Sequence, residues 1–206
     1  MNDTQIMPIS GDLLSHSLFF PFLFLILLLV VVSIVYSTWC NGISPMPTSP
    51  KAKETLLSGL PPGVSGRVYE LGSGWGTLVF PLAKQYPFSQ VIGYETSPLP
   101  YLVSRIWQMA LHLPNVTIKR VDFYTMKLND ASLIMCYLYP EAMVNLRDKF
   151  QEELKPGTWV ISNTFAIPEW TPETILEVDD LYHTKIYLYK VKLNNNTAST
   201  NTDNTI

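Results

Sequence analysis

The sequence predicts an α/β protein with a doubly wound, mostly parallel sheet that ends in an antiparallel hairpin, preceded by one N-terminal transmembrane helix. Three observations predict this fold. Residues 18–36 are almost wholly apolar. Between residues 65 and 192, short β-type runs alternate with helical runs, which is typical of a parallel sheet covered by helices. Two further β-type runs close this domain and can pair as a hairpin.

The apolar run 18–36 is interpreted as a retained membrane anchor. As a helix it would span about 28 Å, close to the roughly 30 Å of a bilayer's hydrocarbon core. A helix at the surface of a soluble domain would have a polar face, which this run lacks, and a helix buried in a soluble core is the alternative. A cleaved signal peptide would begin with basic residues and end on small ones, whereas residues 1–17 contain Asp3 and Asp12 without Lys or Arg, and Trp39 follows the run.

The flanks of the run predict its orientation. The first basic residues, Lys51 and Lys53, follow the apolar run. We therefore expect the catalytic domain on the cytoplasmic side, at the inner membrane in a bacterium, and the short N-terminal segment outside. Residues 37–64 are expected to form a linker and a short helix. The Asn- and Thr-rich residues 193–206 are expected to be disordered.

Within the domain at 65–192, each element follows from local patterning. The helix expected at 140–154 places Met143, Leu146 and Phe150 on one face. The expected strands are 67–71, 90–95, 116–121, 132–138 and 158–164, the expected helices are 75–86, 98–111 and 140–154, and the expected hairpin joins 174–178 to 185–192.

The strongest local signal is the segment Glu70-Leu71-Gly72-Ser73-Gly74-Trp75-Gly76, directly after a strand and expected to open a helix. Glycines let the chain turn sharply and let a ligand touch the backbone. Dinucleotide-binding folds have the spacing GxGxxG around a pyrophosphate. The tighter GxGxG spacing resembles the first motif of methyltransferases that bind S-adenosylmethionine (SAM). Glu70 could orient the ammonium of that cofactor, and a glycine-rich turn without a ligand is the alternative.

Two more acids end the next two expected strands. Glu95 could accept both ribose hydroxyls of a nucleoside, and Asp122 the adenine amino group, with Phe123 beside the base. Either acid alone is more often a solvated loop residue. Three such loops in strand order meet at the carboxyl edge, where open α/β sheets bind ligands. The sequence therefore predicts a SAM pocket at this edge.

Two tyrosines follow the fourth expected strand, in Tyr137-Leu138-Tyr139-Pro140. Many methyltransferases that act on amines have a D/N-P-P-Y loop here. This chain has no Asp, Asn or second Pro in the loop, which argues against methylation of nucleic-acid bases. The tyrosines could orient an amine and offer aromatic faces to a methylated cation, or they could simply pack at a strand end.

Composition argues against two other classes of site. The formal net charge is −3, so no basic field predicts a nucleic-acid partner. The only cysteines, Cys40 and Cys136, lack metal-ligand spacing, and three scattered histidines form no cluster. We expect neither nucleic acid nor a metal.

Several segments together resemble one family, the small membrane-anchored protein-lysine methyltransferases that modify the ATP synthase c-subunit and the ADP/ATP carrier in animal mitochondria, with bacterial relatives. The resemblance covers roughly residues 45–190. It implies a SAM cofactor and a lysine of a membrane protein as acceptor, with Trp170 on the substrate side of the pocket. The matching segments are PMPT at 45–48, ELGSGWG at 70–76, GYETSP at 93–98, SR at 104–105, YPEAM at 139–143, ELKPG at 153–157 and FAIPEWTP at 165–172.

A lysine acceptor must arrive neutral, although its free pKa is about 10.4. A dry pocket lined by Tyr137, Tyr139, Phe165 and Trp170 would lower that pKa. Tethering to a bilayer would raise the local concentration of a membrane-bound acceptor. Three alternatives stay open: methylation of a small hydrophobic or lipid-like acceptor, SAM binding without turnover, and a nicotinamide-dependent reductase, against which the GxGxG spacing argues.

Overall fold

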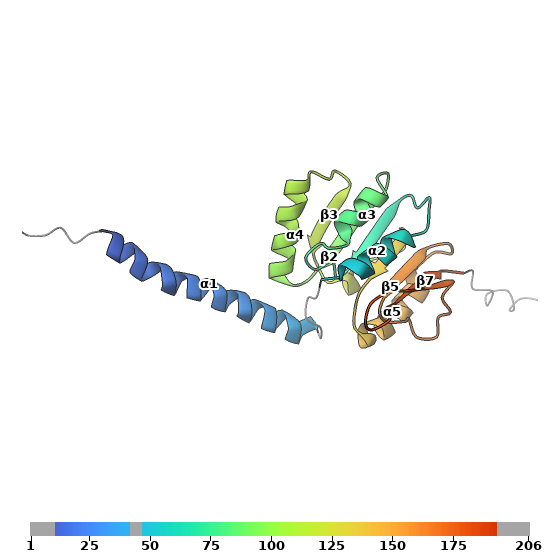
Figure 1. Cartoon of the computed structure of the whole chain (residues 1–206). Coiled ribbons are helices and arrows are strands. Elements are labelled where there is room, and N and C mark those ends of the chain that lie inside the picture. The colour runs from blue at the N-terminus through green and yellow to red at the C-terminus, as the bar shows by residue number, and fades with distance from the viewer. Residues whose placement is uncertain (1–10, 42–46, 193–206) are drawn as a thin grey trace, which may run out of the picture. The chain divides into compact units, whose positions relative to one another are not determined.

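The computed structural model describes residues 11–41 and 47–192, and the chain divides into two compact units, 1–44 and 45–206. The described part of the first unit is the helix α1, Gly11–Asn41 (Figure 1). Its segment Leu18–Trp39 is long and apolar enough to cross a membrane, with a mean hydropathy of 3.2, and no other described helix meets both criteria. The expected apolar helix is therefore present. The tail at 193–206 and the first ten residues lie outside the described part of the chain.

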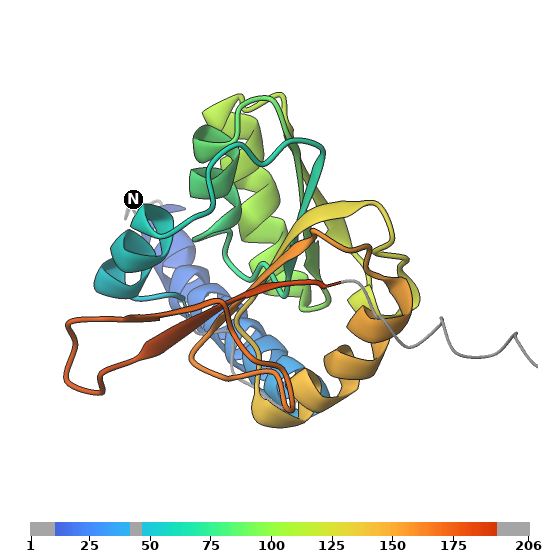
Figure 2. The ribbon, with the colours of Figure 1, turned by 90° about the vertical axis from the view of Figure 1, so that its right-hand side faces the viewer.

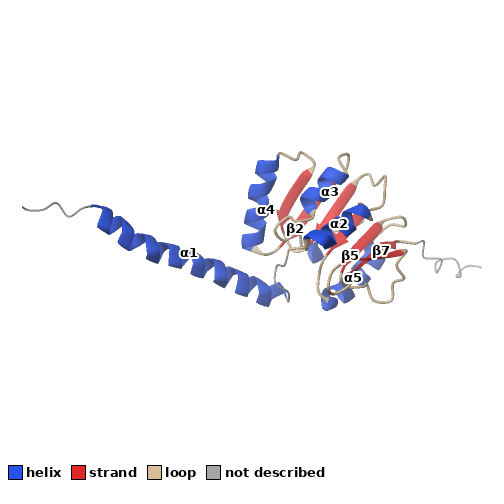
Figure 3. Ribbon diagram, in the orientation of Figure 1, coloured by secondary structure: helices blue, strands red, loops and turns tan. Residues whose placement is uncertain are grey.

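The second unit is built on a seven-stranded sheet in the order β3-β2-β1-β4-β5-β7-β6. Figure 3 shows the strands of this sheet in red and the helices around them in blue. Strands β1 to β5 run parallel, whereas β7 is antiparallel to both β5 and β6. The predicted parallel sheet with its terminal antiparallel hairpin is confirmed. The strands are β1 Arg67–Leu71, β2 Gln90–Glu95, β3 Val116–Arg120, β4 Ala131–Cys136, β5 Trp159–Asn163, β6 Thr174–Glu177 and β7 Lys185–Lys190.

Helices cover both faces of the sheet, because successive strand residues point to opposite sides. Val68 belongs to the core cluster that includes residues of α2 and α3, with Tyr101 of α4 packed against it. Its neighbour Tyr69 belongs to the cluster that includes α5 residues such as Phe150. Figure 2 shows α2, α3 and α4 on one side and α5 on the other. The helices are α2 Pro50–Ser58, α3 Val79–Gln85, α4 Pro98–Leu111 and α5 Pro140–Glu153.

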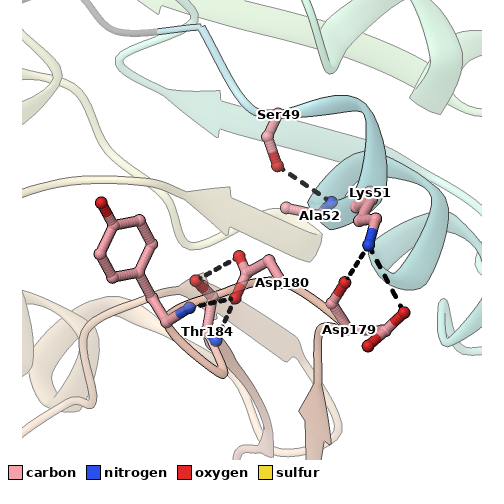
Figure 4. A network of polar contacts seen from close by, with 7 residues as sticks. Ser49, Lys51, Ala52, Asp179, Asp180 and Thr184 are labelled. Carbon is pink, nitrogen blue, oxygen red and sulfur yellow. Dashed lines mark hydrogen bonds and ion pairs between the residues drawn. The ribbon is translucent and has the colours of Figure 1, made fainter.

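Helix α2 is held to the terminal hairpin by polar contacts (Figure 4). Ser49 caps it by accepting a hydrogen bond from the Ala52 amide at 3.2 Å, and proline follows in the first turn. Lys51 donates to the backbone carbonyl of Asp179, just after β6, at 2.5 Å. In the turn between β6 and β7, the Asp180 carboxylate accepts from the amide and hydroxyl of Thr184 at 3.0 and 2.7 Å. These bonds lower the pKa of Asp180.

The expected helix at 75–86 is wrong in its first turn. Gly74 and Gly76 have φ values of +52° and +82°, in the left-handed region, so the chain stays a loop until α3 begins at Val79. Pro81 therefore falls in the first turn of α3, where a missing amide costs no helical hydrogen bond. Between β3 and β4 the chain forms only a short 3₁₀ turn, η1, at Phe123–Thr125.

Candidate active site

The strand register brings the predicted residues to one edge of the sheet. Glu70 in β1 pairs with Gly93 in β2, and Glu95 in β2 pairs with Arg120 in β3. Since these strands are parallel, Glu70, Glu95 and Asp122 all lie at their carboxyl ends. This is the edge where open α/β sheets hold ligands.

The glycine loop after β1 folds back onto β2. The backbone amides of Gly72 and Ser73 both donate to the carbonyl of Tyr94 at 2.9 Å. Gly93 permits this approach, because a Cβ at that position would lie 2.9 Å from the side chain of Ser73. The contact depends on a glycine in β2 that belongs to no part of the GxGxG motif.

Glu95 ties the glycine loop to the start of α4. Its side chain is buried, and one carboxylate oxygen accepts from the amide of Gly74 at 2.7 Å. The other oxygen accepts from the amide of Ser97, also at 2.7 Å. Each carboxylate oxygen can accept a second hydrogen bond. Glu95 therefore fixes the glycine loop to the start of α4 while keeping capacity for further hydrogen bonds.

The carboxyl of Glu70 is less well compensated by hydrogen bonds than that of Glu95. Its side chain is 4% exposed, and within the described residues its Oε2 has no hydrogen-bond partner. Burial raises the pKa of this carboxyl well above its usual value, the nearby charge of Glu95 raises it further, and a hydrogen bond from the Val79 amide opposes the shift. The Ser73 hydroxyl beside it is also buried without a partner in the described chain. A buried, uncompensated carboxyl of this kind fits the ammonium of SAM.

The third strand end is more open. Asp122 is exposed, and its carboxylate caps η1 by accepting from the Tyr124 amide at 2.9 Å. Phe123 is half-buried, and its ring centroid lies 4.5 Å from that of Tyr124. Tyr124 was not predicted as a site residue. Burial raises its pKa to about 12, and the nearby Tyr139 contributes to the shift.

The residues predicted on the acceptor side are half-buried. The two tyrosines lie between β4 and α5, whereas Trp170 packs against other aromatic side chains. Tyr137 directly follows β4, and Tyr139 immediately precedes α5 and packs against the core. Trp170 lies against core residues, with ring centroids 6.2 Å from Phe150 and 5.8 Å from Tyr189. Packing therefore accounts for much of the position of Trp170.

Two residues at the end of β5 were missed. Asn163 ends that strand and is only 2% exposed. Thr164 follows with a φ of +73°, which is rare for a β-branched residue. β5 pairs with β4 up to Cys136 and Ser162, so Asn163 lies level with Tyr137. The polar run Ser162-Asn163-Thr164 after three apolar residues was the available signal.

Cys136 ends β4 and is buried. Burial raises the pKa of Cys136 to about 12, so its thiol is not a nucleophile at neutral pH. Among the residues that the structure describes, no three His, Cys, Asp or Glu side chains lie together as metal ligands.

A family model described as the ANTKMT methyltransferase domain matches residues 70–174, which include all the cofactor loops described above. The chain belongs to this family. Its cofactor is S-adenosylmethionine.

The chain is similar to two named lysine methyltransferases. A protein-lysine N-methyltransferase of Saccharolobus islandicus is 27% identical over 154 residues, covering 71% of this chain and 92% of that protein. The mouse adenine nucleotide translocase lysine N-methyltransferase is 32% identical over 124 residues, covering 59% of this chain and 52% of that one. The match to the mouse protein therefore spans about half of its length.

A solved structure gives the same fold. The RNA methyltransferase from Salinibacter ruber, in complex with S-adenosyl-L-homocysteine (SAH), superposes with a TM-score of 0.63 at 25% identity. The match covers 71% of this chain and 94% of that protein.

Proposed function

We propose that this protein transfers methyl groups from SAM to a lysine of a protein at a membrane. The observation that carries the proposal is the buried carboxyl of Glu70, one oxygen of which has no hydrogen-bond partner within the described residues. It lies at the edge where Glu95 holds the glycine loop, in a chain similar to two lysine methyltransferases. The fold match to an RNA methyltransferase does not by itself select the acceptor, because one fold supports many substrates.

The proposed cofactor roles follow the strand ends. Glu70 pairs with the ammonium of the cofactor's amino acid, and the Gly72, Ser73, Gly74 and Gly76 loop provides close backbone contact. Glu95 accepts the ribose hydroxyls, Asp122 accepts the adenine amino group, and Phe123 contacts the base. Bound SAM supplies an activated methyl group on its sulfonium.

The protein's own task is to position the acceptor and keep it neutral. We assign this task to Tyr137, Tyr139 and Trp170, whose apolar surfaces exclude water and so disfavour the charged form of the lysine. Tyr137 and Tyr139 follow β4 on either side of Leu138. Leu138 lies next to the glycine loop, since a Cβ on Gly72 would be 3.0 Å from its side chain. An amine held at this position would be oriented to accept the methyl group that bound SAM supplies.

In this proposal, α1 anchors the domain to a membrane. Its exposed apolar segment is long enough to span a bilayer. Lys51 and Lys53 follow it, which favours a cytoplasmic location for the domain at 65–192, after the connecting residues 37–64.

Incubation of membranes with radiolabelled SAM and the full chain tests the acceptor class. We expect label in a protein band, recovered as methyl-lysine after hydrolysis, and no label with Glu95→Ala. The variant Glu152→Ala, on the exposed side of α5, should label as the parent does. Label found only in the organic extract would point to a lipid-like acceptor and refute the lysine assignment. SAH binding without any labelled product would refute turnover.

A further inference from the structure

Helix α4 presents an apolar face that the domain leaves exposed. Leu102, Ile106 and Met109 are spaced four and three residues apart and form one stripe on the helix. Their side chains are 55%, 53% and 62% exposed, and Trp107 beside them is 54% exposed. Large apolar side chains gathered on one exposed face mark a surface that binds something.

The opposite side of α4 accounts for its attachment to the domain. Ser104 is fully buried, and the Gln108 amide donates to the carbonyl of Val116 in β3 at 2.7 Å. Helix α4 thus lies along β2 and β3 at the edge of the unit (Figure 1). The exposed stripe is therefore the outer side of a firmly packed helix.

The charges of α4 distinguish it from the other long helix of the domain. Arg105 is the only charged residue between Pro98 and Leu111, and its guanidinium donates to Gln108 at 2.6 Å. Helix α5 carries an ordinary solvated surface, with exposed Asp148 and Glu152. An exposed helix face with Trp and long aliphatic side chains, a flanking Arg and no acid is typical of helices that lie in a membrane interface.

We propose that the exposed face of α4 lies on the lipid surface of the membrane to which α1 anchors the chain. The tether favours a bilayer over other occupants. Only eight residues separate Asn41, the end of α1, from Pro50, the start of α2. A chain segment of that length reaches at most about 30 Å. A domain so tethered stays within reach of the bilayer, at a high effective concentration of lipid.

Docking through α4 orients the candidate active site. Helix α4 begins at Pro98, directly after Glu95 and Ser97 at the carboxyl edge of the sheet. Contact of α4 with lipid therefore keeps the cofactor pocket beside the membrane surface, where lysines flanking a membrane-protein segment lie. This inference rests on the proposed anchor. It adds to the proposed function the position of the acceptor lysine, at the surface of the membrane.

Depth-dependent quenching in the full chain tests the proposal. An environment-sensitive fluorophore is placed at Met109→Cys and, as the matched control, at Glu152→Cys, both in a Cys40→Ser background. The remaining Cys136 is buried and unreactive. The protein is reconstituted into vesicles of phosphatidylcholine and phosphatidylglycerol, with or without lipids that carry a nitroxide near the headgroup.

We expect roughly threefold stronger nitroxide quenching at position 109 than at position 152, as an interfacial helix requires. Adding Ile106→Asp should reduce quenching at position 109 to the control level while SAH binding is unchanged. Equal quenching at the two positions in vesicle-bound protein would overturn the proposal and leave the anchor standing. Protein that fails to float with vesicles would refute the anchor and the inference together. The fluorophore at position 109 could instead be shielded from water, without nitroxide quenching, to an extent that depends on the protein-to-lipid ratio. That result would indicate that a second copy of this chain covers α4, and it would also overturn the proposal.

Discussion

The ends of β1 and β2 each carry a buried glutamate, and the two side chains have opposite effects on the stability of the ligand-free protein. Glu95 accepts two backbone hydrogen bonds at 2.7 Å and so stabilises the loops on either side of it. Glu70 is equally buried, yet one of its oxygens has no partner in the described chain, and burial raises its pKa. The first carboxyl maintains the pocket before any ligand arrives. The second has an electrostatic cost that a bound cation would relieve.

Glu95→Ala should have the largest effect, because it removes the acceptor for the Gly74 and Ser97 amides and the proposed ribose ligand together. We expect SAH binding to weaken by at least about tenfold, which is about 1.4 kcal/mol, and unfolding free energy to fall by about 2–3 kcal/mol. Calorimetric titration and urea denaturation measure these two quantities. Unchanged binding would remove Glu95 from the pocket.

Substitutions at two glycines, Gly74 and Gly76, separate the loop's contribution to stability from its role in binding. Gly76→Ala would place a Cβ 2.4 Å from the ring of Phe80, at a φ of +82°, and should cost about 2–3 kcal/mol of stability. Gly74→Ala meets nothing within 4 Å at a φ of +52° and should cost only about 1 kcal/mol. Gly74→Asp should weaken SAH binding by about tenfold or more, because its carboxylate would lie next to Glu95. Equal denaturant midpoints for the two alanine variants would contradict the loop conformation.

Glu70 should make the free protein and the complex respond to pH in opposite directions. Its folded pKa is raised, so its contribution to stability is complete below the unfolded pKa, about 4.3, and is lost as the pH rises through the folded value. A cationic ligand favours the carboxylate, so SAH binding should release a proton and tighten over the same range of pH. Calorimetry in buffers of different ionisation enthalpy measures that proton.

Glu70→Gln should abolish both pH dependences and should stabilise the free protein at neutral pH, whereas Glu95→Gln should destabilise it. If Glu70→Gln lowers the stability as much as Glu95→Gln does, the two carboxyls play the same structural role and the contrast between them is wrong.

Trp170→Phe should have the smallest effect on the cofactor. The ring packs against Phe150 and Tyr189, so we expect a loss of about 1 kcal/mol in stability with SAH affinity unchanged. Its methyl-transfer rate tests whether Trp170 also lines the acceptor side. A parent-like rate would assign it to packing alone.

The sequence predicts the sheet well because its strands are short apolar runs bounded by turn residues, and the expected helix at 98–111 agrees with α4 at both ends. The expected strand at 132–138 is shorter, Ala131–Cys136. Periodicity could not predict the late start of α3, which depends on the left-handed backbone at Gly74 and Gly76.

The site was only partly predictable for a related reason. A strand-end acid is visible in the sequence, so the placement of Glu70, Glu95 and Asp122 at one edge of the sheet could be predicted. The hydrogen bonds of such an acid cannot be predicted from the sequence, because they depend on how the loops fold back onto the strands. One example is the approach of Ser73 to β2, which Gly93 permits. The different electrostatic positions of Glu70 and Glu95 therefore emerge only from the folded chain.

The most direct test of the central claim compares two ligands in two variants by calorimetric titration at neutral pH. SAH carries the amino acid, and 5′-methylthioadenosine lacks it. If Glu70 binds the ammonium, Glu70→Gln weakens SAH about tenfold and leaves methylthioadenosine unchanged, whereas Glu95→Ala weakens both ligands. Loss of both ligands in Glu70→Gln, or of neither, would contradict the account.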